Sequence, residues 1–131
     1  MTTYLGTGLS AMLSVRRGAE AVEFYKAAFD AEVLFLHQDE ASGEVIANLA
    51  IGPANLWLSD ESIEYKNFSP ETLNGTTVRL VLTVEDPHAA YEQAIEAGAT
   101  AICPVRDEHS WRVGKLADPF GHVWEIGKPL R

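Results

Sequence analysis

Apolar residues occupy every second position between Ala11 and Val15, and Ser10, Met12 and Ser14 alternate with them. This period of two predicts a strand with one apolar face and one mixed face. We expect the apolar face to pack against a helix. The mixed face is typical of a sheet that lines a cavity.

The period then changes to that of a helix. Val22, Tyr25 and Phe29 recur at spacings of three and four residues, which predicts a helix with one buried stripe. The first part of the chain therefore predicts a strand followed by a helix.

The same order returns in the second half of the chain. Residues 79–84 alternate in the same way as residues 10–15. Asp86 then fits the N-cap of a helix, Pro87 fits its first position, and Gly98 follows its end. The chain therefore contains an internal repeat.

Three short strand candidates follow each predicted helix. Turn signals such as Gly52-Pro53 and Asp118-Pro119 separate them. The candidates span residues 32–38, 44–51, 54–59, 99–104, 110–117 and 121–127. Each half is therefore a βαβββ module, and the predicted fold class is α+β.

The two modules predict a single domain. Module 1 spans about residues 9–59 and module 2 about residues 77–127, and we interpret the polar stretch 60–76 as a connector without an element of its own. Each module alone leaves a sheet face half covered. We therefore expect the modules, within one chain or across two chains, to pair into a curved mixed sheet, with the helices outside and a cup between the halves.

Charge and cysteine content limit which partners and which cellular compartment we expect. The 131 residues carry a formal net charge of −9, which disfavours nucleic acid and membrane surfaces as partners. The same charge attracts cationic small molecules, or only keeps the protein soluble. No apolar run approaches the ~20 residues that span a bilayer, and the N-terminus lacks a signal-peptide pattern. A single cysteine, Cys103, is typical of a reducing compartment, so we expect a cytoplasmic protein.

Several segments carry a resemblance to a known family. The most specific is residues 114–124, which contains Asp118-Pro119-Phe120-Gly121-His122. The others span residues 21–32, 49–52, 58–61, 69–71, 84–86 and 94–99. Together with the doubled module, they resemble the vicinal oxygen chelate superfamily of glyoxalases, bleomycin-resistance proteins and extradiol dioxygenases, and within it the PhnB-like branch. The resemblance implies that superfamily's fold and a homodimer.

The resemblance also implies four positions for a metal site. In the superfamily's metalloenzymes, the first and last strands of each module hold a divalent metal at the floor of the cup. The matching positions here are Ser10, Trp57, Arg79 and Glu125. Only Glu125 is a good ligand, because an indole has no lone pair to offer and a guanidinium carries a fixed positive charge. We therefore expect no cofactor, and a divalent metal is the less favoured alternative.

Arg79 and Glu125 carry opposite charges at two of these positions. The family places the first and last strands of a module side by side, so we predict a direct contact in which Arg79 occupies the space of the metal. An unpaired Glu125 would instead be a candidate catalytic acid or base.

Three further side chains complete the candidate ligand site. We expect Trp57, Trp111 and Arg112 to line the cup together with Ser10, because indole rings bind organic and cationic ligands well. Packing in the core or in a dimer interface is the alternative for Trp57 and Trp111. Trp124 is expected in the core.

Two main functions remain open. A metal-poor cup predicts a protein of the bleomycin-resistance type that binds a small organic ligand, and drug sequestration is one form of this function. The alternative is a glyoxalase-like metalloenzyme, a lyase, isomerase or dioxygenase, that acts on a small oxygenated substrate through Glu125. A third reading is a structural or regulatory dimer without chemistry, so the sequence leaves enzymatic activity undecided.

Overall fold

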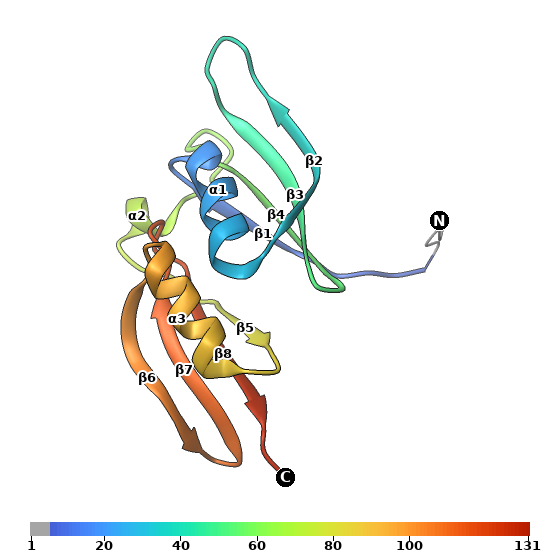
Figure 1. The fold of residues 1–131 in the computed structure, drawn as a ribbon. Helices are drawn as coiled ribbons and strands as arrows, with labels where there is room; N and C mark the ends of the chain where they lie inside the picture. The colour runs from blue at the N-terminus through green and yellow to red at the C-terminus, as the bar shows by residue number, and fades with distance from the viewer. Residues whose placement is uncertain (1–5) are drawn as a thin grey trace.

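The computed structural model describes residues 6–131, and two βαβββ modules follow one another along the chain (Figure 1). The first module contains β1 (Ala11–Val15), α1 (Gly18–Phe29), β2 (Glu32–Gln38), β3 (Val45–Ile51) and β4 (Ala54–Asp60). The second contains β5 (Arg79–Thr83), α3 (Pro87–Ala97), β6 (Thr100–Glu108), β7 (Trp111–Ala117) and β8 (Val123–Pro129). The predicted α+β fold class is confirmed.

Each module forms a mixed four-stranded sheet. The strand orders are β1-β4-β3-β2 and β5-β8-β7-β6, so the first and last strands of each module are parallel neighbours. Leu13 and Val15 are buried and Met12 is exposed, as the alternation predicts. The apolar face of each sheet packs under the helix of its own module.

Local signals set the ends of the two long helices. The Asp86 side chain accepts the N–H of Ala89 at 3.2 Å, and Gly98 ends α3 as predicted. At the end of α1, Asp30 adopts a left-handed conformation with φ of 56° and donates its N–H to the Tyr25 carbonyl. None of the helices within residues 6–131 is long and apolar enough to cross a membrane.

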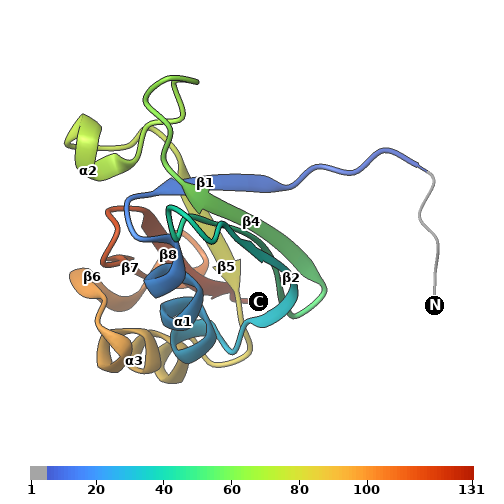
Figure 2. The ribbon, with the colours of Figure 1, turned by 90° about the horizontal axis from the view of Figure 1, so that it is seen from above.

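A third, short helix, α2 (Pro70–Leu73), lies in the stretch that we expected to be a connector without an element of its own. That expectation is wrong. The Ser69 side chain caps this helix by accepting the N–H of Thr72 at 3.2 Å, and a proline occupies the first position. Figure 2 shows α2 apart from the other helices and close to one end of β1.

The modules are joined through their helices and through one loop. Helix α1 packs against α3, and the two helices lie next to each other in Figure 2. The Tyr25 hydroxyl donates to Asp118, and His122 Nε2 lies 3.0 Å from the Ser14 carbonyl oxygen. The buried residues form one core that spans both modules, and Trp124 lies in it as predicted.

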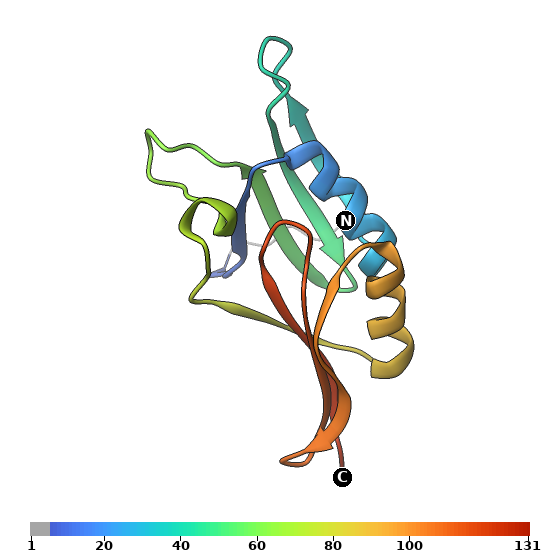
Figure 3. The same ribbon diagram turned by 90° about the vertical axis from the view of Figure 1, so that its left-hand side faces the viewer.

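The sheets turn their helix-free faces outward. Figure 3 shows α1 and α3 along one side of the molecule and the strands on the other. Met12 of the first sheet is 52% exposed, and Val81 of the second is 62% exposed. Both halves of the expected cup are therefore open to solvent in the single chain.

Candidate functional site

Four side chains form one row across the helix-free face of the first sheet. The register pairs Met12 with Trp57, Trp57 with Asn48, and Asn48 with Phe35. Their neighbours along β1, β3 and β4 pack into the core under α1, so the row faces away from that helix. We call Met12, Phe35, Asn48 and Trp57 the aromatic face.

Asn48 is the buried polar centre of the aromatic face. The rings of Phe35 and Trp57 flank it, with centroids 6.3 Å apart. The residue is 8% exposed, and its Nδ2 atom has no hydrogen-bond partner among residues 6–131. Sequence reasoning found Trp57 but missed Phe35 and Asn48. The signal that could have found Asn48 is a single polar residue within the otherwise apolar strand Val45–Ile51.

A second row lies on the helix-free face of the second sheet. The register pairs Val81 with Glu125 and Glu125 with Lys115. Arg79 Nε lies 3.3 Å from Glu125 Oε2, and Lys115 Nζ lies 4.0 Å from the same oxygen. The predicted contact of Arg79 with Glu125 is confirmed, and Lys115 is a second cation that sequence reasoning missed. We call Arg79, Val81, Lys115 and Glu125 the charged face.

The four metal-equivalent positions do not fit a divalent metal. Glu125 offers their one carboxylate, and Arg79 and Lys115 already contact it. Ser10 is exposed just before β1, and the indole of Trp57 has no lone pair to offer. Among residues 6–131, no cluster of three or more His, Cys, Asp or Glu side chains could hold a metal ion. These positions therefore support no metal-dependent step.

The structure separates Trp111 from Arg112. Alternation along β7 puts Trp111 on the face of Lys115 and Arg112 on the face of Gly114, which packs against α3. On that side, Arg112 Nε lies 2.8 Å from Asp107 Oδ1, and this hydrogen bond lowers the pKa of the Asp107 carboxyl. The expectation that Arg112 lines the cup is wrong, whereas Trp111 remains a candidate.

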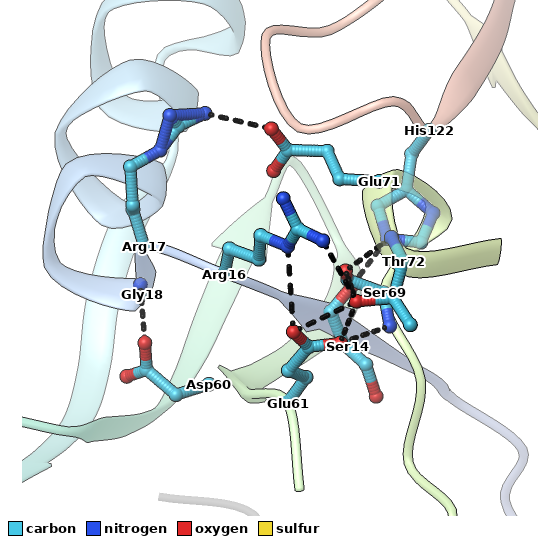
Figure 4. Close-up of polar contacts among 10 residues, drawn as sticks. All are labelled: Ser14, Arg16, Arg17, Gly18, Asp60, Glu61, Ser69, Glu71, Thr72 and His122. Carbon is cyan, nitrogen blue, oxygen red and sulfur yellow. Dashed lines mark hydrogen bonds and ion pairs between the residues drawn. The ribbon is translucent and has the colours of Figure 1, made fainter. Parts of the chain in front are cut away.

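A polar network anchors the connector beside β1 (Figure 4). Glu61 accepts the N–H of Ser69 at 2.9 Å and the hydroxyl of Thr72 at 2.8 Å, and Arg16 Nε lies 3.5 Å from its other oxygen. The bond from the Ser69 N–H holds the pKa of Glu61 below its ordinary value. Since Glu61 is engaged by all these groups, we interpret the network as a structural anchor for α2.

Comparison with known families identifies the family to which this two-module chain belongs. A family model described as a glyoxalase-like domain matches residues 10–127. The chain belongs to this glyoxalase-like family. The match runs from the start of β1 into β8 and so includes both faces and the loop between β7 and β8 that contains Asp118. It confirms the predicted kinship with the vicinal oxygen chelate superfamily.

The similarity to one related protein and to two solved structures covers nearly the whole chain. An uncharacterized protein of Mycobacterium bovis is 38% identical over 128 residues, which are 94% of this chain and 84% of the relative. The crystal structure of TioX from Micromonospora sp. ML1 aligns with a TM-score of 0.73 at 22% identity, over 95% of this chain and 100% of TioX. A glyoxalase/bleomycin resistance protein/dioxygenase family enzyme from Burkholderia phytofirmans aligns with a TM-score of 0.71 at 19% identity, over 92% of this chain and 97% of that one. The two structures share the fold with this chain.

Proposed function

We propose that this protein binds a small organic ligand in a cup between the aromatic face and the charged face, without a metal. The observation that carries the proposal is the pair of rings at Phe35 and Trp57, which flank a buried donor on an open sheet face. Such rings offer a broad, rigid contact surface to flat organic molecules. The net charge of −9 favours neutral or cationic ligands over anions.

We further propose that a second copy of the chain closes the cup. Met12 and Val81 are more than half exposed on the two faces, and burial of such apolar side chains favours association. In this homodimer, the aromatic face of one protomer lies opposite the charged face of its partner.

Light scattering tests the homodimer. The expected mass is about twice the 14.3 kDa of one chain, and Val81→Glu is expected to reduce it to that of one chain. Ile63→Glu is the matched control, because Ile63 is similarly exposed but lies in the connector. A wild-type mass near 14.3 kDa contradicts the proposed dimer.

A thermal-shift screen tests ligand binding. The probes are flat aromatic compounds, neutral and cationic, together with aldehyde–thiol adducts for the enzymatic alternative. A ligand present at a hundred times its Kd stabilises the native state by about 2.7 kcal/mol. Trp57→Leu is expected to abolish the shift, and Tyr65→Leu, which removes an exposed ring of the connector, is expected to keep it. If no probe stabilises the wild type, or if Trp57→Leu responds like the wild type, the proposal fails.

The alternative function is a glyoxalase-like metalloenzyme, a lyase, isomerase or dioxygenase, with Glu125 as its catalytic residue. Its support is the family and the place of Glu125 in the last strand of module 2. The two cations that contact Glu125 favour ligand binding over this alternative. The PhnB-like branch and the cytoplasmic location stay predictions.

A further inference from the structure

Asn48 holds an unused hydrogen-bond donor in the middle of the aromatic face. The residue is 8% exposed, and within the described part of the chain its Nδ2 atom has no hydrogen-bond partner. A buried donor without an acceptor destabilises a free protein, so such groups are rare and call for an explanation. A ligand that supplies the acceptor would recover that loss on binding.

The surroundings of Asn48 favour an organic acceptor over a trapped water molecule. A buried water needs two to four polar partners. The cross-strand neighbours of Asn48 are Phe35 and Trp57, and the next residues on its face of β3 are Ile46 and Ala50. None of these side chains offers an acceptor, so a water molecule there would be poorly held.

The two flanking rings contact each other and lie slightly closer together than a flat molecule between them requires. Their centroids are 6.3 Å apart and their planes are inclined by 53°. A flat ring between them needs about 7–8 Å, which is two contacts of ~3.5–4.0 Å each. Phe35 is 50% exposed and lies on β2, the edge strand of its sheet. Rotation of the Phe35 side chain can therefore open the required space while β3 stays in place.

We propose that Asn48 selects ligands that carry a carbonyl oxygen on a flat aromatic ring system. The ring system lies between Phe35 and Trp57, and its carbonyl oxygen accepts a hydrogen bond from Asn48 Nδ2. The inference rests on the proposed function and adds the feature by which the ligand is recognised. An aromatic compound without an acceptor fills the same space but leaves the donor unpaired, so it binds more weakly.

A matched pair of probes tests this selection. Fluorenone and fluorene are flat and nearly equal in size, and they differ in the carbonyl group at the central ring. Calorimetric titration is expected to give a Kd for fluorenone about tenfold lower than for fluorene, which corresponds to one net hydrogen bond. Asn48→Leu is expected to reduce this ratio to about twofold or less. Asn55→Leu is the matched control, because Asn55 is exposed and lies two residues before Trp57 on the same strand.

Two further measurements keep the test independent of the folding of one variant. Urea unfolding is expected to show Asn48→Leu at least as stable as the wild type, because the variant removes an unpaired buried polar group. In the wild type, the side-chain amide NMR signal of Asn48 is expected to shift downfield with fluorenone and not with fluorene.

The outcomes separate this inference from the proposed function. If both probes bind the wild type equally, or if Asn48→Leu keeps the preference for fluorenone, selection by Asn48 is refuted while ligand binding stands. If neither probe binds, the stacked subsite is refuted as well. The proposed function then stands or falls with the wider thermal-shift screen and the Trp57→Leu variant.

Discussion

Tyr25 links the two modules through a hydrogen bond to a buried carboxylate, and removal of this bond should lower the free energy of unfolding. Asp118 is 4% exposed and accepts hydrogen bonds from the Tyr25 hydroxyl, from Trp124 Nε1 at 3.0 Å, and from the N–H groups of Phe120 and His122 at 2.9 and 3.0 Å. These four donors are neutral groups. Tyr25→Phe would leave the buried carboxylate one donor short.

The expected loss can be scaled against a second buried tyrosine. A hydrogen bond to a charged group contributes about 1.5–3 kcal/mol, whereas a neutral one contributes about 0.5–1.5 kcal/mol. The Tyr91 hydroxyl donates to the Lys115 carbonyl oxygen at 3.1 Å, so Tyr91→Phe removes a neutral bond within one module. Tyr25→Phe should therefore lower the free energy of unfolding by about 1 kcal/mol more than Tyr91→Phe.

Urea unfolding of the two variants and the wild type measures this difference. Burial, and then the charge of Asp118, raise the pKa of Tyr25 well above its ordinary value. The stability that this raised pKa contributes is fully present below about pH 10 and is lost as the pH rises further. Tyr25→Phe should weaken that alkaline loss. If Tyr25→Phe costs no more than Tyr91→Phe, the carboxylate does not join the modules in the way described.

Three further predictions concern the scaffold. The lowered pKa of Glu61 contributes stability at neutral pH that is lost as the pH falls from roughly 5 to 3, and Glu61→Gln should flatten this loss in urea titrations at several pH values. Gly114→Ala should lower the free energy of unfolding by about 1–3 kcal/mol, because its Cβ would lie 2.8 Å from the Tyr91 ring. Arg112→Gln should lower the free energy of unfolding by less than about 1 kcal/mol, because the ion pair that it breaks, with Asp107, is exposed. A larger loss in urea unfolding would contradict this expectation.

The elements with local signals could be predicted from the sequence. The cap at Asp86, the stop at Gly98 and the alternating strands depend on neighbouring residues, and the structure has them in the expected places. The helix α2 also has a local signal, Ser69 before Pro70. It was missed because four helical residues within a polar stretch show no apolar stripe.

The candidate site was only partly predictable, because cross-strand register decides which side chains meet. The contact of Arg79 with Glu125 could be predicted, because it followed from the strand order that the family implies. The place of Lys115 beside Glu125, and of Asn48 between two rings, depends on registers that one sequence does not specify. Arg112 was misplaced because proximity to Trp111 along the chain does not put two strand residues on one face.

Metal content most directly tests the proposal that the cup binds an organic ligand without a metal. The measurement is elemental analysis of the full chain purified without chelators, with nickel, zinc, iron and manganese determined per protomer. The arginine and lysine that contact Glu125 predict far less than one metal ion per protomer. A stoichiometric divalent metal that survives dialysis and is lost in Glu125→Gln would contradict metal-free binding in the cup.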